Sequence, residues 1–181
     1  MKLVIASDIH GSAYYCKKLI DRFEEEKADR LLLLGDILYH GPRNPLPKDY
    51  NPKKVAEMLN GIKDRVLCVR GNCDAEVDQM MLDFPILSDY AVIDTGCGVI
   101  FATHGHKYDE NNLPPLKKGD IFAFGHIHVP IYREKDGVIC INPGSVSLPK
   151  ENGKNGYMVF CDGEFVWKDV DGNVYKTEKG I

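Results

Sequence analysis

The chain has 181 residues, of which 44% are hydrophobic and 28% charged, as in an ordinary folded domain and unlike disordered or fibrous proteins. A net charge of −4 argues against a surface built for tight, non-specific nucleic-acid binding. No apolar run reaches the about 20 residues that span a membrane, and Asp8 and His10 interrupt the first apolar run too early for a signal peptide. We therefore expect a cytoplasmic protein without membrane contact.

The first half of the chain alternates strand-like and helix-like segments. Short apolar runs typical of buried parallel strands occupy residues 3–6, 31–34 and 66–69. Apolar residues at helical spacing predict one helix that follows Ser12 and includes Phe23, and a second that begins at Pro52 and includes Ile62. We expect Asp74 to cap a further short helix that extends to Leu82.

The second half changes to short strands separated by turns. These strands are predicted at residues 91–94, 99–102, 121–124, 131–133, 138–142, 157–161 and 164–168. Asp136-Gly137 and Asp162-Gly163 predict tight hairpins. Three strand–helix units followed by a strand-rich half predict two sheets packed face to face with helices outside, in one domain over residues 1–181. The proline-rich loop 38–51 is long enough to expect a function for it.

Six cysteines are scattered through the chain without a C-x-x-C pair, and we expect all of them to be free thiols. They are Cys16, Cys68, Cys73, Cys97, Cys140 and Cys161.

Residues that can bind metals follow five of the predicted strands. In chain order these residues are Asp8, His10, Asp36, Asn72, His104, His126 and His128. The carboxyl ends of strands in open α/β sheets converge on one crevice, so these side chains should meet there. Any one of them has an ordinary explanation, such as a turn or a core histidine, but burying all seven would be costly unless a metal neutralised them.

The residue types also limit the metal and the substrate. Imidazoles combined with carboxylates and an amide oxygen suit Mn, Fe, Co, Ni or Zn, and seven ligands suggest two ions about 3.5–4 Å apart. Two divalent ions carry four positive charges, of which two aspartates and a bridging hydroxide offset three, so about one remains. Such a site attracts an anion, and hydrolysis of a phosphate ester is the natural reaction.

The same motifs resemble the signature of a known family. Asp8-x-His10, Gly35-Asp36, Gly71-Asn72, Gly-flanked His104 and Gly125-His126-x-His128 resemble the calcineurin-like metallophosphoesterase superfamily. Residues 39–45, 70–74 and 142–145 resemble its YfcE-like phosphodiesterase branch, and the similarity weakens only in the last about 15 residues. The resemblance implies an α/β fold, the four-layer α/β/β/α sandwich of metallo-dependent phosphatases, and a binuclear metal centre.

The resemblance also assigns the ligands. It implies one metal held by Asp8, His10, Asp36 and His128. The other metal would be held by Asp36, Asn72, His104 and His126, so that Asp36 bridges the two. The family implies Mn²⁺ as a common activating metal, with Zn²⁺, Fe²⁺, Co²⁺ or Ni²⁺ as alternatives, and assembly into a dimer or tetramer.

Further residues are weaker candidates. His106 lies outside the matched ligand set and either supports the ligands, contacts phosphate or is structural. His40 and Arg43 could bind the phosphate or the leaving group of the substrate, although Arg43 could equally be solvated or paired with Asp49. Ser145 is expected to be structural.

Cys73 is a departure from the wider superfamily, in which a histidine after the asparagine is thought to protonate or stabilise the leaving group. A neutral thiol is a weaker donor than an imidazolium. We therefore expect a preference for diesters with acidic leaving groups, unless Cys73 is merely a small residue beside the metals.

The sequence thus predicts a small-substrate phosphodiesterase, in which a metal-bound hydroxide attacks phosphorus in line and Asp36, Asn72, Cys73 and His106 are the catalytic residues. One alternative is a phosphomonoesterase or nucleotide pyrophosphatase on the same centre. Another, from a different class, is a protein-binding scaffold like the retromer subunit that resembles this fold. A scaffold need not keep the full ligand set, whereas this chain has all seven residues.

Overall fold

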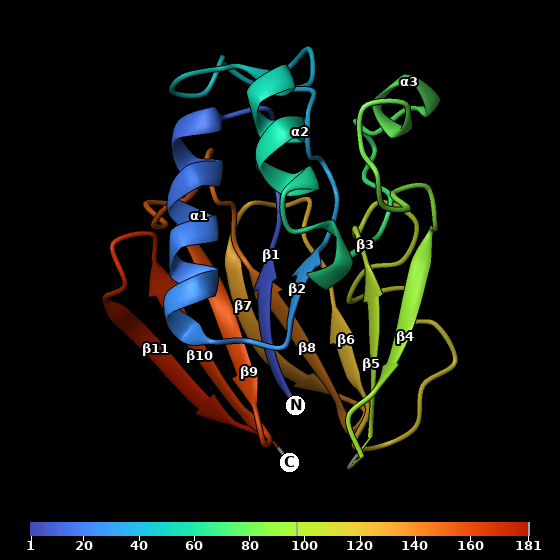
Figure 1. The fold of residues 1–181 in the computed structure, drawn as a ribbon. Helices are drawn as coiled ribbons and strands as arrows, with labels where there is room; N and C mark the ends of the chain where they lie inside the picture. Colours follow the sequence, from blue (N-terminus) through green and yellow to red (C-terminus); the bar gives the residue numbers. More distant parts are fainter. Residues whose placement is uncertain (97, 181) are drawn as a thin grey trace.

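Two β-sheets packed face to face form the centre of the computed structural model, which describes residues 1–96 and 98–180 (Figure 1). The six-stranded sheet has the order β11-β10-β9-β1-β2-β3. Its strands are β1 (Lys2–Ala6), β2 (Arg30–Leu33), β3 (Val66–Cys68), β9 (Gly156–Cys161), β10 (Glu164–Asp169) and β11 (Val174–Lys179). The five-stranded sheet has the order β4-β5-β6-β8-β7. Its strands are β4 (Tyr90–Asp94), β5 (Val99–Thr103), β6 (Ile121–Ala123), β7 (Pro130–Lys135) and β8 (Val138–Pro143).

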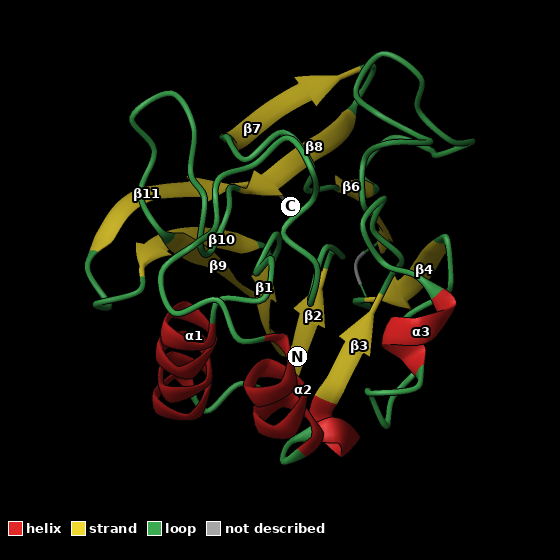
Figure 2. Ribbon diagram, turned by 90° about the horizontal axis from the view of Figure 1, so that it is seen from above, coloured by secondary structure: helices red, strands yellow, loops and turns green. Residues whose placement is uncertain are grey.

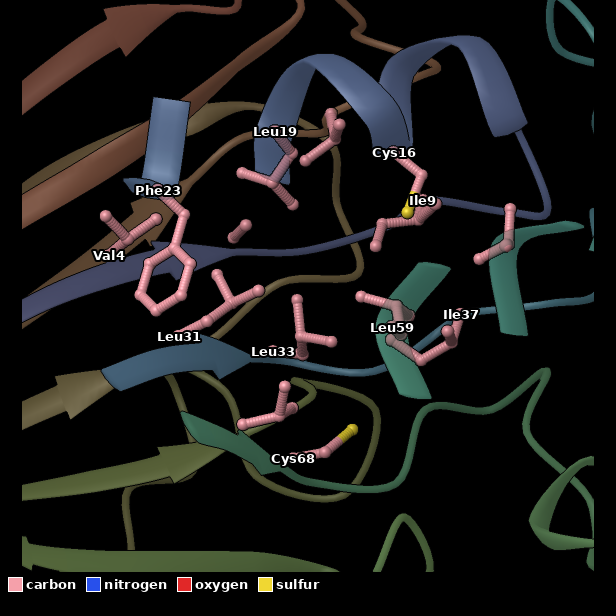
Figure 3. Close-up of a cluster of buried hydrophobic side chains, with 14 of the residues drawn as sticks. Val4, Ile9, Cys16, Leu19, Phe23, Leu31, Leu33, Ile37, Leu59 and Cys68 are labelled. Carbon is pink, nitrogen blue, oxygen red and sulfur yellow. The ribbon is translucent and has the colours of Figure 1, made fainter. Parts of the chain in front are cut away.

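Helices α1 (Ala13–Glu26) and α2 (Pro52–Asn60) cover the outer face of the six-stranded sheet (Figure 1). The N-cap of α1 is Ser12, whose hydroxyl accepts a hydrogen bond from the Tyr15 amide, as the sequence predicts. Asn51 caps α2, and Pro52 occupies its first turn. Phe23 and Leu19 of α1 are fully buried against apolar residues of the sheet such as Leu31 (Figure 3).

The remaining core lies between and behind the sheets. Between them, a cluster that includes Ile5, Leu32, Ile121 and Trp167 is fully buried. On the outer face of the five-stranded sheet, the apolar residues of β5, β6 and β8 pack against side chains of the loop 104–120, and this cluster contains no residue of a described helix. The two predicted sheets are confirmed, and the outermost layer on this side is a loop.

The sheet directions bring the predicted site residues to one edge. β1, β2 and β3 are mutually parallel, and so are β5, β6 and β8. Figure 2 looks down on the loops at this edge, between the helices and the five-stranded sheet. Among the described residues, no helix is long and apolar enough to cross a membrane.

Three details differ from the sequence prediction, and one prediction lies outside the described residues. The short helix α3 (Glu76–Gln79) begins after Ala75, so Asp74 does not cap it, for a reason given below. Helix α2 ends at Asn60 because Gly61 is its C-cap, and Ile62 lies beyond it. Strand β11 was not predicted, because its exposed, charge-rich sequence lacks an apolar alternation. Cys97 lies outside the described residues, whereas the other five cysteines are free.

The hairpin predictions are confirmed. Asp136 and Gly137 both have positive φ values, of 54° and 81°, as do Asp162 and Gly163, at 47° and 78°. Two successive residues in the left-handed region match the twist of the strands that each turn joins, β7 to β8 and β9 to β10.

Candidate metal centre

The backbone under the predicted ligands is unusual. Five of them adopt the left-handed region that residues other than glycine seldom enter: Asp8 (φ 59°), His10 (50°), Asp36 (57°), His126 (68°) and His128 (62°). Each such residue costs on the order of 1 kcal/mol or more, and such strain persists only where the surrounding structure enforces it. The concentration of such residues after strands β1, β2 and β6 of the two sheets indicates that the loops are shaped to aim these side chains at one place.

Three buried side chains form what we call the closed half of the site: Asp8, His10 and His128. Their solvent exposure is 0%, 1% and 3%. The Nε2 atoms of the two histidines lie 3.2 Å apart. The Asp8 Oδ1 atom lies 3.4 Å from the His10 Nε2 atom and 3.2 Å from the His128 Nε2 atom. These three ligand atoms can therefore surround a single ion.

The open half consists of Asn72, His104 and His126. The His104 Nε2 atom lies 3.0 Å from the Asn72 Oδ1 atom and 3.2 Å from the His126 Nδ1 atom. His104 is buried, whereas His126 is half-buried and Asn72 is exposed. This half is more exposed than the closed half, but its Asn72 and His126 ligand atoms both lie within 3.2 Å of the His104 Nε2 atom.

Asp36 lies between the two halves. Its Oδ2 atom is 3.7 Å from the Nε2 atom of His10 and 3.4 Å from that of His104. Its Oδ1 atom accepts a hydrogen bond of 2.8 Å from the Cys73 amide, which fixes the carboxylate plane. A single carboxylate oxygen of Asp36 thus lies within 3.7 Å of histidines from both halves.

Backbone carbonyls determine the tautomers of three histidines. The Nδ1 atoms of His10, His104 and His128 lie 2.9, 2.6 and 2.6 Å from the carbonyl oxygens of Tyr39, Leu34 and Leu148 respectively. A carbonyl can only accept, so each Nδ1 atom must carry the hydrogen. In the neutral form, each Nε2 atom therefore presents a lone pair to the site, as a metal ligand requires.

The pKa shifts of the buried carboxylates and histidines indicate which ions the site can bind. Burial opposes ionisation of Asp8, but the imidazole rings of His10 and His128, 3.4 and 3.2 Å from its carboxylate, outweigh it and hold the pKa of Asp8 well below its usual range. Burial lowers the pKa of His104, but Asp36 and Asp8 outweigh it and raise the pKa to about 9. The buried Asp8 Oδ1 atom has no hydrogen-bond partner of good geometry. The Nε2 lone pairs and carboxylate oxygens that converge here repel one another unless the histidines are protonated or cations bind between them. The residues therefore fit divalent ions.

The segment 142–148 braces the closed half from behind. The Ser145 and Ser147 hydroxyls both donate to the Asp8 carbonyl, at 2.8 and 3.0 Å. The Asn142 side chain donates to the Gly125 carbonyl at 2.7 Å, next to His126. Ser145 is expected to be structural, and its contact explains how: its hydroxyl helps hold Asp8 in the left-handed conformation. Ser147 has the same role and was not singled out from the sequence, because a serine in a turn carries no distinctive signal.

Asp74 joins the loops of Asp36 and Asn72, which explains why it does not cap α3. Its carboxylate accepts hydrogen bonds from the amides of Asp36 (2.8 Å), Ile37 (2.9 Å) and Gly71 (2.7 Å). Gly71 is required at this junction, because a Cβ atom there would lie 2.1 Å from the Asp36 Oδ1 atom. The sequence prediction of Asp74 as a helix cap was wrong because a carboxylate that follows a strand by a few residues can serve either purpose.

A cleft of about 510 Å³ opens from the site to solvent. It is lined by Asp36, Gly41, Pro42, Arg43, Asn44, Asn72, Cys73, His126, Ile127, His128 and Lys150. Burial and the charge of Asp36 raise the pKa of the Cys73 thiol, which keeps it neutral. Lys150 belongs to no motif and was not predicted.

Two other candidates do not line this cleft. His40 packs between Tyr39 and Tyr50, with ring centroids 4.8 and 5.2 Å away. His106 is exposed, and its ring centroid lies 5.4 Å from that of His104. Asp49 pairs with Lys54 at 3.7 Å, and no ion pair joins it to Arg43 among the described residues.

Comparison with known proteins agrees with this geometry. The model of the calcineurin-like phosphoesterase superfamily domain matches residues 1–162. Phosphodiesterase YfcE of Escherichia coli (strain K12) is 45% identical over 157 residues, which are 87% of this chain and 85% of that protein. A solved structure of Yfce, described as a phosphoesterase from E. coli, has a TM-score of 0.97 and 39% identity, with both chains fully covered.

A more distant match shows the fold alone. The structure of Vacuolar Protein Sorting 29 from Cryptosporidium parvum has a TM-score of 0.64 and 18% identity, and covers 98% of this chain and 97% of that one. The family model, in contrast, extends over both halves of the site and the segment that braces them. The chain therefore belongs to the calcineurin-like phosphoesterase superfamily.

Proposed function

We propose that this protein is a binuclear metal-dependent phosphodiesterase that acts on small substrates, with Mn²⁺ as its metal. The observation that carries the proposal is the position of Asp36, whose Oδ2 atom lies within 3.7 Å of histidines from both halves of the site. Similarity to Phosphodiesterase YfcE supports the diester as the substrate class.

The residues divide into two ligand sets that share Asp36. Asp8, His10 and His128 of the closed half would hold one ion, and Asn72, His104 and His126 of the open half the other. The net charge of the ligands favours this arrangement, since two carboxylates leave two divalent ions with a positive charge that can attract a phosphate ester.

Two divalent ions in such a site supply a nucleophile from water near neutral pH and offset the charge of the phosphoryl oxygens. The residues of the chain provide the geometry for this chemistry. The carbonyl partners of His10, His104 and His128 keep their Nε2 lone pairs aimed inward. Cys73, neutral and at the cleft wall, can offer only a weak thiol donor to a leaving group.

The open half favours a diester over a monoester. Asn72 is exposed and the cleft opens to solvent there, so a substituent on each side of the phosphorus can be accommodated. His106 beside this half and Arg43 in the cleft wall are proposed to assist through the ligands and the phosphate respectively. Four points stay predictions: substrate binding by His40, a cytoplasmic location, assembly into a dimer or tetramer, and a single domain over residues 1–181.

The test is hydrolysis of bis(4-nitrophenyl) phosphate by chelated protein before and after metal addition. We expect metal-free protein to be inactive, Mn²⁺ to restore activity, and 4-nitrophenyl phosphate to be a poorer substrate. Full activity after verified metal removal would refute the metal-dependent mechanism, and a clear preference for the monoester would replace the diesterase by a phosphatase.

A further inference from the structure

The cleft wall contains two cationic side chains besides the predicted metal ligands. Arg43 and Lys150 both line it, together with the metal-site residues Asp36, Asn72 and His126. Among the described residues that line the cleft, Asp36 is the only one with a carboxylate, and it belongs to the candidate metal centre. Within residues 1–96 and 98–180, the side chains of Arg43 and Lys150 have no ion pair or hydrogen bond. Nearby Lys107 and Arg70, in contrast, pair with Asp89 and Glu76.

The backbone of Lys150 is tied to the closed half of the site. Its amide donates to the His128 carbonyl at 3.1 Å, and its own carbonyl accepts from the Gly153 amide at 2.8 Å. The His128 ring in turn donates to the Leu148 carbonyl, two residues before Lys150. The start of the Lys150 side chain therefore has a fixed position relative to the metal ligands.

The backbone around Arg43 is also tied to the site. It lies in a turn in which the Asn44 amide donates to the Gly41 carbonyl at 3.3 Å, and the Asn44 side chain donates to the His40 carbonyl at 2.9 Å. The carbonyl of Tyr39, the residue before His40, accepts a hydrogen bond from the His10 ring. A Cβ atom on Gly41 would lie 3.0 Å from the Cys73 Sγ atom, so this turn packs directly against the site.

We propose that Arg43 and Lys150 form a second anion subsite, and that the substrate is a phosphodiester with an additional phosphate group outside the bond that is cleaved. This inference rests on the proposed function. A diester phosphate has a single negative charge, which two divalent ions would neutralise, so the two exposed cations Arg43 and Lys150 can bind a second anion. A planar guanidinium and a mobile ammonium suit a terminal phosphate. Short nucleotides with a terminal phosphate belong to this class.

The test uses three dithymidine nucleotides as inhibitors of bis(4-nitrophenyl) phosphate hydrolysis by the Mn²⁺-loaded protein. TpT has one phosphate, whereas pTpT and TpTp have a second one on either side of the internal diester. We expect pTpT, TpTp or both to inhibit at concentrations about fivefold or more below that of TpT, and this advantage to shrink at high salt. Inhibition constants can be compared whether or not the nucleotides are themselves cleaved.

The variant R43Q/K150Q distinguishes the subsite from direct binding of the terminal phosphate to the metals. We expect it to keep two metals per chain but to lose the advantage of pTpT and TpTp over TpT. The control K53Q removes an exposed lysine of α2 outside the cleft and should retain the advantage.

Equal inhibition by all three nucleotides in the wild type, no inhibition by any, or an advantage that persists in R43Q/K150Q would overturn the subsite. If bis(4-nitrophenyl) phosphate is hydrolysed with metal dependence in that case, only this inference fails. Absence of that hydrolysis would instead contradict the proposed function.

Discussion

The two halves of the site differ in how they are built. The ligand atoms of the closed half are almost inaccessible, their residues are in left-handed backbone, and hydroxyls from the segment 142–148 hold Asp8 from behind. The open half has one buried histidine, one half-buried histidine and one exposed asparagine. Two of its residues, Asn72 and His126, line the cleft, whereas the closed half contributes only His128. The difference teaches that the fold holds the predicted ligands of the closed half as part of its core and leaves those of the open half nearer to solvent.

Removing the carboxylate shared by the two halves should have the largest effect. We expect Asp36→Asn to lose both metals and to reduce kcat by about 10³-fold or more, because losing both ions removes several kcal/mol of transition-state stabilisation. Metal content per chain and kcat are the measurements. Asp21→Asn, at an exposed position of α1, is the control. Two metals retained by Asp36→Asn would show that the halves do not depend on a shared ligand.

Replacing one histidine in each half should show that the two halves contribute differently to metal binding and stability. We expect His128→Ala to lose the metal of the closed half, with a fall of more than about 100-fold in its affinity. It should also destabilise the protein, because the Leu148 carbonyl loses a buried partner. His126→Ala should lose the other metal with little change in the stability of metal-free protein, since its ring is half-buried. Equal destabilisation by both variants would contradict the distinction.

The stability of metal-free protein should depend on pH through His104. Its pKa is raised to about 9, so its protonated form contributes stability that is complete below about pH 6.5 and is lost as the pH rises through 9. We expect the free energy of unfolding in urea to fall by up to about 3 kcal/mol between pH 6.5 and 9.5. Metal-loaded protein should show no such fall, since its histidines are already deprotonated. A flat or rising profile for metal-free protein would be the opposite result.

The smallest expected effect concerns Cys73, at the edge of the open half. Its raised pKa keeps the thiol neutral, so it assists a leaving group only weakly. We expect Cys73→His to increase turnover of alkyl diesters relative to aryl diesters by about tenfold or more, because a general acid matters most for a basic leaving group. Rates over a series of leaving-group pKa values measure this. Should the variant bind both metals and gain nothing on alkyl diesters, Cys73 is simply a small residue beside the metals.

The sequence predicted those features for which the chemistry allows only a few residue types. All seven predicted ligands lie close together, in the loops that follow strands of both sheets. They could be predicted because an apolar strand followed at once by a glycine or histidine motif marks both the strand and its end. Both hairpins follow from their Asp-Gly pairs, since only certain residues tolerate the left-handed region.

Other features could not be predicted because they depend on tertiary contacts. Asp74 has the right residue type for a cap, and only the approach of the Asp36 loop gives it different partners. Lys150 enters the cleft because its backbone bonds to His128, a contact between segments that no local pattern reveals. Strand β11 forms because β10 offers it an edge, although its own sequence is polar.

Anomalous scattering from crystals grown with Mn²⁺ tests the central claim most directly, namely that two ions share Asp36. We predict two peaks per chain about 3.5–4 Å apart, one beside His10 and His128 and the other beside His104 and His126, with Asp36 in contact with both. A single peak, or two peaks too far apart for one carboxylate to bridge, would contradict the account.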